Sequence, residues 1–281
     1  MRTNKANSLL IKTRTYVTLF LRARSVDAFL ASYPKSGRTW FRFVLANYFA
    51  ILAGVDTELA LHAMFEYLPN FDLDPGRGLP VRDSAGLAWL PLVAVTHKRY
   101  QRMLFQGRPV IFMVRDPRDL LVSAYFHETR HKQRFDGSMD QFLVDNGRGL
   151  PALQRYLNAW GAQLERHPHL VLSYETLSSD AFKATTDVLA FLGEREDASA
   201  LRTAISRSRF DVMQGRERVE GIRGHSYDLG DDQSLRMRNG KVGAFTEHLS
   251  ASQVTMIETS LRTGLNQGAK ALVAKTGLDL G

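Results

Sequence analysis

Four short runs of apolar residues recur along the chain, separated by turns and by segments with helical periodicity. The runs begin at Ala28, Leu92, Pro109 and His169, and none is longer than a few residues. Continuous apolar runs of four to eight residues are typical of strands that are buried on both faces, as in a parallel sheet. Strands alternating with helices predict an α/β fold with a central parallel β-sheet flanked by helices, not a helical bundle or a β-sandwich.

Helical patterns are clearest in six other segments. Residues 41–52 are apolar nearly all round, which predicts a helix buried on more than one side. Pro117, with acidic residues in the first turn, starts another helix that continues through Leu120 and Tyr125. The remaining helices are predicted over residues 137–146, 151–166, 181–193 and 249–261.

Two long stretches lack periodicity, and the chain beyond residue 261 is predicted to be a tail. Residues 57–88 are irregular, and residues 206–250 are dominated by Gly and charged residues. Long loops in a compact domain usually have a function or are mobile. Phe65, Tyr67 and Phe71 either wall a ligand pocket or belong to the core, and the sequence favours neither interpretation.

The first apolar run leads into a loop that is suited to anions. Lys35, Ser36, Arg38 and Thr39 surround Gly37, and a helical pattern follows at once. Free backbone N–H groups and the positive end of the helix dipole favour an anion at such a helix start. Two cations and two hydroxyl groups lie in the same loop, so the sequence predicts a phosphate or sulfate site here.

Composition is compatible with several classes of partner. The chain has 281 residues, 37 Lys plus Arg against 29 Asp plus Glu, and a formal net charge of +8. This excess suits an anionic ligand, a nucleic acid or an acidic membrane surface, and charge alone does not choose among them. No cysteine is present, which excludes disulfides and thiolate metal sites. The basic residues are scattered and no recognition motif is visible, so no nucleic acid is expected.

Residues 1–24 alternate basic and apolar groups. They form either an amphipathic segment, in weak peripheral contact with a membrane or lying over a ligand site, or an extension packed on the domain with its basic face in water. We favour the extension. No apolar run approaches the roughly 20 residues of a membrane-spanning helix. The clean stretch Tyr16–Leu21 is shorter than the about 7–15 residues of a signal h-region. We therefore expect a cytoplasmic protein.

The anion loop is not the familiar P-loop, in which the lysine follows a glycine, because Lys35 precedes Gly37. The stretch Tyr33-Pro34-Lys35-Ser36-Gly37-Arg38-Thr39-Trp40 resembles instead the 5′-phosphosulfate loop of sulfotransferases that use 3′-phosphoadenosine 5′-phosphosulfate (PAPS), Tyr-Pro-Lys-Ser-Gly-Thr-Thr-Trp. Seven of eight positions match, and Arg38 is the departure. The resemblance implies the sulfotransferase fold, which is similar to that of P-loop kinases.

Two later segments resemble the same family. Thr96-His97 matches the Lys-Thr-His segment that contains the family's catalytic base, with Val95 in place of the lysine. Residues 115–125 match the 3′-phosphate segment Arg-Asn/Asp-Pro-x-Asp-x-x-x-Ser-x-Tyr with its spacing intact, so that Arg115 and Ser123 fall on its ligands. The resemblance covers roughly residues 25–265, and we expect one sulfotransferase domain over 25–281 after the extension 1–24.

The adenine and second phosphate segments are matched less closely. Tyr174 falls on the family's Tyr-Glu segment, and Phe210 on the segment whose aromatic ring packs on adenine. Residues 238–245 resemble Arg-Lys-Gly-x-x-Gly-Asp-Trp, with Asn239, Ala244 and Phe245 departing from it. The family's dimerisation pattern is not found at residues 246–255, so the oligomeric state stays open.

The resemblance implies a role for each matched residue. His97 takes the proton of an acceptor hydroxyl, Lys35 neutralises the bridging oxygen, and the serine matching Ser123 restrains that lysine until an acceptor arrives. Sulfuryl transfer needs no metal here, since cations neutralise the charge and no carboxylate cluster is visible. The product would be adenosine 3′,5′-bisphosphate (PAP). The residues expected to bind PAPS are Lys35, Ser36, Gly37, Arg38, Thr39, Trp40, Arg115, Ser123, Tyr174, Phe210, Arg238, Asn239 and Gly240.

The acceptor is left open, and two alternative functions are kept. A small-molecule, carbohydrate or lipid hydroxyl is expected as acceptor, in a pocket built from the loops at 57–90, 127–150 and 215–236. A P-loop-type kinase would share the strand–loop–helix core but would need a Gly-Lys-Ser/Thr loop and a magnesium-binding aspartate. An inactive PAPS-binding protein would retain the loop without turnover.

Overall fold

A central sheet of four parallel strands confirms the predicted fold class. The computed structural model describes residues 14–79, 87–105, 107–221, 231 and 234–281. The strands are β1 (Ala28–Ser32), β2 (Val93–Thr96), β3 (Val110–Val114) and β4 (His169–Ser173). Their order in the sheet is β2-β1-β3-β4, and all three pairings are parallel. β1, the first strand of the chain, therefore lies inside the sheet between β2 and β3.

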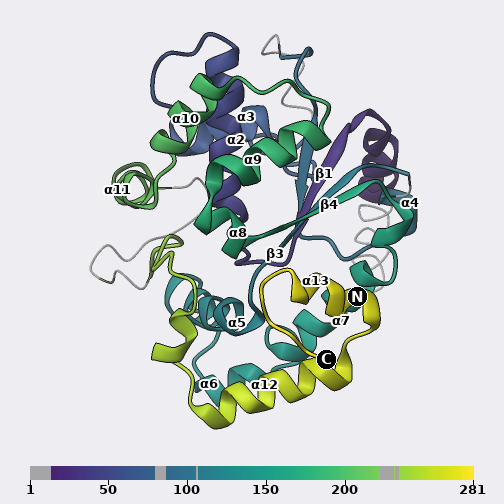
Figure 1. The fold of residues 1–281 in the computed structure, drawn as a ribbon, viewed down its shortest axis with the longest axis vertical. Helices are drawn as coiled ribbons and strands as arrows, with labels where there is room; N and C mark the ends of the chain where they lie inside the picture. Colours follow the sequence, from purple (N-terminus) through teal and green to yellow (C-terminus); the bar gives the residue numbers. More distant parts are fainter. Residues whose placement is uncertain (1–13, 80–86, 106, 222–230, 232–233) are drawn as a thin grey trace, which may run out of the picture.

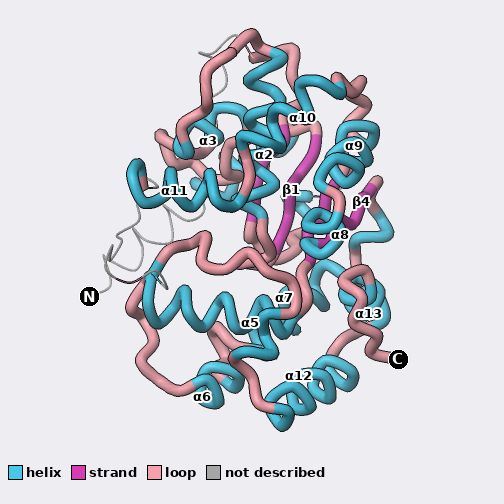
Figure 2. The backbone as a smooth tube through the Cα atoms, turned by 60° about the vertical axis from the view of Figure 1, so that its left-hand side comes forward, coloured by secondary structure: helices cyan, strands magenta, loops and turns pink. Residues whose placement is uncertain are grey.

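Helices cover both faces of the sheet, as Figures 1 and 2 show. Phe29 and Ala31 of β1 point to one hydrophobic core and Leu30 to the other, as the alternation of side chains along a strand requires. The first core is completed by α5 (Pro117–Phe126), α6 (Met139–Val144), α7 (Leu150–Gly161), α12 (Ala251–Gly264) and α13 (Gln267–Ala274). The second is completed by α2 (Arg38–Leu52), α3 (Met64–Tyr67), α8 (Tyr174–Ser179), α9 (Ala181–Phe191) and α10 (Ala198–Arg207).

The helix predicted over 41–52 is α2, and it begins three residues earlier, at Arg38. Every residue from Phe41 to Ala50 is buried, as the continuous apolar pattern predicted. Gly37 is the N-cap of the helix, and its left-handed conformation (φ +86°) turns the chain out of the loop. This places the first turn of α2 against the end of β1.

Several boundaries differ from the predictions. The irregular stretch 57–88 contains a short 3₁₀ turn (Leu61–Ala63) and α3, and its residues 80–86 lie outside the described part. The fourth strand ends at Ser173, because the Ser173 hydroxyl caps α8 by accepting from the Thr176 N–H. The helix predicted over 151–166 ends at Gly161 and is followed by the 3₁₀ turn Leu164–Arg166.

Two predictions about irregular segments were wrong. Residues 206–250 include α11 (Phe210–Glu220), and residues 222–230 and 232–233 lie outside the described part. The expected tail contains α13, where Asn266 caps the helix and donates two hydrogen bonds to Asn158 of α7, from its backbone N–H to Oδ1 and from its side-chain amide to the carbonyl. The remaining elements are α4 (Arg102–Phe105) and short turns at Ala23–Ser25, His127–His131 and Ala244–Glu247.

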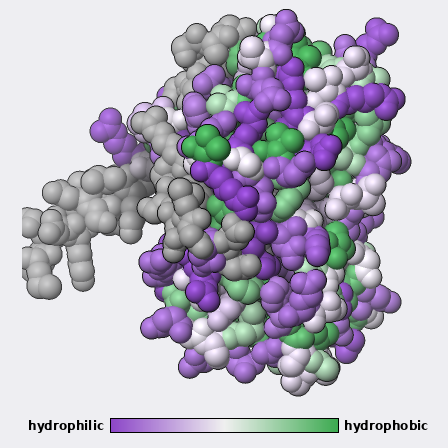
Figure 3. All heavy atoms as spheres, turned by 90° about the vertical axis from the view of Figure 1, so that its left-hand side faces the viewer, coloured by the Kyte–Doolittle hydropathy of each residue, from purple (hydrophilic) through white to green (hydrophobic). Residues whose placement is uncertain are grey.

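The described end of the N-terminal segment packs on the domain. Residues 14–22 are helical, and Leu19 and Ala23 are buried in the first core, whereas Val17 and Leu21 are exposed. Residues 1–13 lie outside the described part, so the membrane interpretation of 1–24 stays a prediction. Within the described ranges, no helix has the length and apolar character needed to cross a membrane. On the face shown in Figure 3, described apolar side chains form separate small patches among polar ones.

Candidate active site

Three of the predicted site residues follow directly after strands of the sheet. His97 follows β2, Arg115 follows β3, and Tyr174 follows β4. The strands are in register, with Ala31 opposite Thr96 and Val114 opposite Ser173. Because parallel strands end at the same edge of a sheet, these side chains gather there. Ligands bind in open α/β sheets at this edge.

A cavity of about 870 Å³ opens at this edge, and we call it the cofactor cavity. It brings together the predicted residues Lys35, Gly37, Arg38, Thr39, Trp40, His97, Arg115, Ser123, Tyr174, Phe210, Arg238, Asn239 and Gly240. Ser36 is not among the lining residues, because its side chain is buried and its hydroxyl donates to the Tyr33 carbonyl at 2.9 Å.

Sequence reasoning missed some of the lining residues. Asp119 and Arg236 are the charged ones, and Val122, Met237 and Ala244 are the others. Asp119 belongs to a motif that was noticed, but nothing in its local pattern showed what it would contact. Arg236 lies two residues before Arg238 in a segment without periodicity, and its Nη2 donates to the Thr39 hydroxyl at 3.3 Å.

The loop between β1 and α2 holds its shape through two residues with positive φ. Gly37 has φ +86° and Lys35 has φ +74°, which is uncommon for a residue with a side chain. Such conformations cluster at ligand sites, where the surrounding structure enforces them. The loop therefore presents the free N–H groups at the start of α2 to the cofactor cavity.

Lys35 is the cation at the centre of the loop. Its Nζ donates to the Arg236 carbonyl at 3.4 Å. Burial and the neighbouring charge of Arg236 lower the pKa of Lys35 to about 7, which Glu217 partly opposes. Between described residues, no hydrogen bond joins Lys35 to Ser123, although both line the cavity.

His97 is held in one tautomer. Its Nδ1 lies 2.7 Å from the backbone carbonyl oxygen of Ser32 at the end of β1. A carbonyl only accepts, so Nδ1 carries the proton and Nε2 keeps a lone pair. Desolvation by the surrounding protein, followed by the positive charge of Arg38, lowers the pKa of His97 well below its ordinary value. The ring is therefore neutral at pH 7 and can accept a proton at Nε2.

Arg115 lies over Tyr174, between the loop that contains Lys35 and the segment that contains Lys241. Its guanidinium carbon is 4.4 Å from the Tyr174 ring centroid, and its Nη groups donate to the carbonyls of Lys35 at 3.4 Å and Lys241 at 3.3 Å. Asp119 lies 3.8 Å from the same guanidinium. The Nε of Arg115 is buried and has no partner among the described residues. A ligand oxygen would satisfy it.

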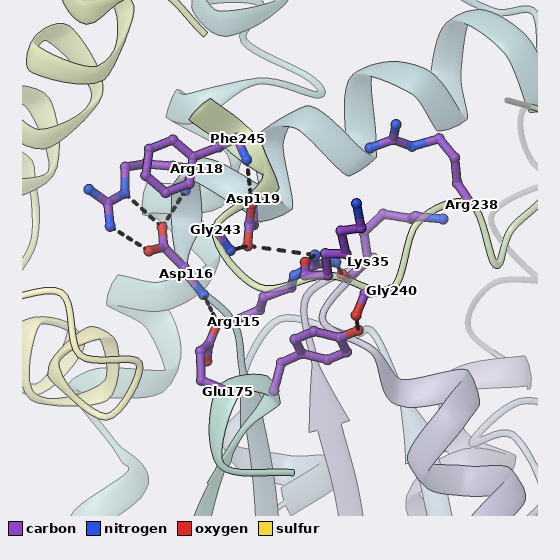
Figure 4. A network of polar contacts seen from close by, with 12 residues as sticks. Lys35, Arg115, Asp116, Arg118, Asp119, Glu175, Arg238, Gly240, Gly243 and Phe245 are labelled. Atoms are coloured by element: carbon purple, nitrogen blue, oxygen red, sulfur yellow. Dashed lines mark hydrogen bonds and ion pairs between the residues drawn. The ribbon is translucent and has the colours of Figure 1, made fainter. Parts of the chain in front are cut away.

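Asp119 fastens the loop at 243–245 to the start of α5. Its two carboxylate oxygens accept from the N–H groups of Gly243 and Phe245, both at 2.8 Å (Figure 4). The side chain is 2% exposed, so loss of either bond would leave a buried polar group unpaired. Asp119 thereby sets the position of the segment that ends the last motif.

A second set of contacts surrounds this attachment (Figure 4). Arg118 pairs with Asp116 at 2.6 Å and with Glu258 at 2.7 Å, and its guanidinium carbon lies 4.2 Å from the Phe245 ring centroid. Glu175 accepts from the Asp116 N–H at 2.9 Å. The contacts join α5, α8, α12 and the loop at 243–245 around the cavity wall. Phe245 departs from the family motif yet keeps an aromatic ring at that position.

Aromatic rings form one side of the cofactor cavity. Trp40 and Tyr174 meet edge to face at 5.8 Å, and the Tyr174 hydroxyl donates to the Gly240 carbonyl at 2.7 Å. Gly240 has φ +70° and lies against the Phe210 ring, which a Cβ on Gly240 would approach to 2.5 Å. A Cβ on Gly37 would likewise come within 2.3 Å of the Tyr174 ring. Both glycines are required for these rings to lie where they do.

Arg238 enters the cavity from the same segment as Gly240. Its guanidinium carbon lies 4.3 Å from the Phe126 ring centroid, and its Nη1 is 3.4 Å from Nε2 of His248. Asn239 lines the cavity beside it. Five basic residues, Lys35, Arg38, Arg115, Arg236 and Arg238, thus line the cavity with a single acidic residue, Asp119. Such a charge distribution suits a polyanionic ligand.

A second cavity, of about 610 Å³, adjoins the first. The two share Arg38 and His97, and the second is completed by Asn70, Phe71, Asp72, Val95, Thr96 and Lys98. Phe71, for which core and pocket were both open, serves both: it packs edge to face on Phe29 at 4.9 Å and lines this cavity. Phe65 and Tyr67 are buried in the second core. Among described residues, no group of three or more His, Asp or Glu is placed to hold a metal ion.

Comparison with known sequences identifies the domain. The model of the family described as "Sulfotransferase domain" matches residues 25–268. Cytosolic sulfotransferase 17 of Arabidopsis thaliana is 25% identical over 85% of this chain and 74% of its own length. The 3-alpha-hydroxysteroid sulfotransferase of Cavia porcellus is 25% identical over 81% and 79%. The flavonol 3-sulfotransferase of Flaveria bidentis is 24% identical over 90% and 86%.

Solved structures share the fold. A mouse sulfotransferase, SULT7A1, complexed with PAP superposes with a TM-score of 0.57 at 21% identity, over 88% of both chains. Retinol dehydratase in complex with androsterone and the inactive cofactor PAP gives a TM-score of 0.62 at 19% identity, over 86% of this chain and 81% of that one. At these identities the likeness concerns the fold alone.

Proposed function

Since this chain belongs to the sulfotransferase family, as its sequence motifs predicted, we propose that it transfers the sulfuryl group of PAPS to a hydroxyl group of an acceptor. The strongest support is that five basic side chains and three aromatic rings line one cavity at the carboxyl edge of the sheet. A nucleotide with a phosphosulfate and a 3′-phosphate has the matching charges and ring. Two solved structures that share the fold, the mouse sulfotransferase and retinol dehydratase, are complexes with PAP.

The residues present fit that co-substrate. The Lys35–Thr39 loop with the start of α2 would hold the 5′-phosphosulfate, and Arg115, Ser123, Arg238 and the Asn239–Gly240 backbone would hold the 3′-phosphate. The Nε of Arg115 supports this assignment, because it is a buried hydrogen-bond donor that has no acceptor among the described residues. Trp40, Tyr174 and Phe210 would enclose adenine.

The chemistry proposed for His97 and Lys35 rests on the family resemblance, and the free lone pair at Nε2 of His97 supports it. When bound, PAPS supplies the sulfuryl group, and the electron pair of the broken S–O bond leaves with PAP. An acceptor hydroxyl oxygen forms the new O–S bond, and Nε2 of His97 takes its proton. Lys35 offsets charge at the leaving oxygen, and the remaining cations position the phosphates. No metal enters this scheme.

The test is a transfer assay with radiolabelled PAPS and a pooled panel of phenols, alcohols, sugars and hydroxy acids. We expect label in at least one acceptor and stoichiometric release of PAP. Tight PAP binding without any transfer, on the panel or on extracts, would favour the inactive binding protein. Transfer of the γ-phosphoryl group from ATP with Mg²⁺, and none from PAPS, would favour the kinase.

The family's relatives indicate a class of acceptor only broadly. Those compared here are named for a hydroxysteroid and a flavonol, which are small molecules with hydroxyl groups. We propose a small-molecule hydroxyl for this chain as well, received in the second cavity beyond His97.

A further inference from the structure

Arg38 is the residue at which this chain departs from its family's phosphosulfate loop, and its side chain lies where the two cavities meet. It occupies the first turn of α2 and lines both the cofactor cavity and the second cavity, as His97 does. The family has threonine there. The long cationic side chain of Arg38 therefore lines the same two cavities as His97, the proposed base, on the side from which an acceptor would approach.

The guanidinium of Arg38 has no partner in the described part of the chain. No hydrogen bond or ion pair joins it to another described residue. Arg42, one turn later on the same helix, differs. Its guanidinium donates to Asn70 Oδ1 at 2.9 Å and to the Leu68 carbonyl, and it stacks on Phe65 at 4.2 Å. Arg42 is therefore a structural cation, whereas the partly buried Arg38 lines both cavities without a hydrogen-bond or ion-pair partner among the described residues.

The surroundings of Arg38 are deficient in negative charge. Burial, followed by the charge of Arg236, lowers the pKa of Arg38 to about 9, with Tyr156 and then Asp72 acting in the opposite direction. The positive charges of Arg236 and Arg42 also lower the pKa of His97. The second cavity adds Lys98 and has Asp72 as its acidic residue. A poorly solvated cation without a partner is costly unless an anion pairs with it.

Resting on the proposed function, we infer that the acceptor is itself an anion: a hydroxyl compound that bears an oxyanion group, a carboxylate or a sulfate or phosphate ester, which pairs with Arg38 in the second cavity. A planar guanidinium pairs with such groups through two parallel hydrogen bonds. Pairing would fix the hydroxyl next to Nε2 of His97. The added negative charge would also raise the pKa of His97 toward the range in which a general base is effective.

The experiment uses matched acceptor pairs that differ only in charge. The isomeric hydroxybenzoates, hydroxyphenylacetate and a hexuronic acid would each be compared with its methyl ester, with PAP release as the readout. In the wild type, the anionic member of the preferred pair should have a kcat/KM at least tenfold higher than its ester. In Arg38→Thr that preference should vanish, mainly through KM for the anion, and Arg38→Lys should retain part of it. Arg202→Thr, an exposed residue on α10, is the matched control.

Each remaining outcome has a defined meaning. Equal or better use of the esters by the wild type would overturn the inference, as would a preference that survives in Arg38→Thr. Loss confined to the KM for PAPS would assign Arg38 to the phosphosulfate instead. If no pair is turned over, the same compounds are titrated into PAP-saturated protein, and absence of a charge preference there also overturns it. Failure to bind PAP at all would instead refute the proposed function.

Discussion

The two cavities that meet at His97 are built in different ways. The cofactor cavity is fastened by hydrogen bonds between distant segments, such as Asp119 to the backbone of Gly243 and Phe245 and Tyr174 to Gly240. The second cavity shares with it Arg38, a cation for which no described residue supplies a hydrogen bond or ion pair. Lining segments that are fixed by hydrogen bonds can hold one ligand in one position. A cavity with an unpaired cation selects its ligand by the negative charge that the ligand carries.

The largest effect is expected at His97, one of the two residues that line both cavities. His97→Ala removes the only lone pair assigned to proton transfer, so kcat should fall by about 10³-fold, within the usual range for a general base. PAP affinity should change less than twofold, because the backbone bond to Ser32 orients His97 and not the phosphate loops. Steady-state turnover and calorimetric titration of the same preparation measure both. Turnover within a few fold of the wild type would remove His97 from the mechanism.

Arg115→Ala tests whether the cofactor cavity reads the 3′-phosphate. Loss of a charge-assisted contact of about 1.5–3 kcal/mol should weaken PAP binding by about 100-fold. Binding of 5′-AMP, which lacks the 3′-phosphate, should change little and serves as the internal control. Equal losses for both nucleotides would mean that Arg115 supports the fold of the site and does not contact that phosphate.

Asp119→Asn tests the fastening itself. An amide can accept from one of the two N–H groups but places its own donors toward the other, so the loop at 243–245 should loosen. PAP affinity should fall about tenfold while kcat at saturating PAPS is largely kept, because the altered group does not reach the sulfuryl position. Asp187→Asn, at an exposed pair on α9, is the control. Unchanged PAP affinity would contradict a positioning role.

The smallest expected effect is on pH dependence. Because the pKa of Lys35 is lowered to about 7 in the ligand-free protein, its cation is lost as the pH rises through 7. A bound polyanion raises that pKa again, so binding takes up a proton, and PAP affinity should weaken about fivefold between pH 7 and pH 8. Titration in buffers of different ionisation enthalpy would show the proton. In Lys35→Met the slope should flatten, and a wild-type affinity independent of pH would contradict this account.

Most residues that line the cofactor cavity could be predicted, because they belong to short local sequence motifs. The apolar runs gave the strands, and residues directly after β2, β3 and β4 fell at one edge because parallel strands end together. Family motifs then supplied the residue roles. The hydrogen bonds from Gly243 and Phe245 to Asp119 could not be predicted, since they join residues more than 120 positions apart.

The rest of the fold escaped prediction for physical reasons that particular residues show. α11 is largely polar, yet its Glu217 is fully buried and accepts from the N–H groups of Arg236 and Met237, a partnership that only tertiary structure creates. α13 is short, and its N-cap Asn266 bonds to Asn158 of α7, a residue 108 positions earlier in the chain. The second cavity combines residues of α2, β2 and the segment near Phe71, so no local pattern marks it.

The measurement that tests the central claim most directly is calorimetric titration of the wild-type protein with PAP, with 5′-AMP and Mg²⁺-ATP in parallel. If the cofactor cavity holds a nucleotide by both of its phosphates, PAP will bind with a dissociation constant at least 100-fold lower than that of either rival. Comparable binding of PAP and 5′-AMP, or tighter binding of Mg²⁺-ATP, would contradict the assignment of Arg115 and Arg238 and with it the use of PAPS.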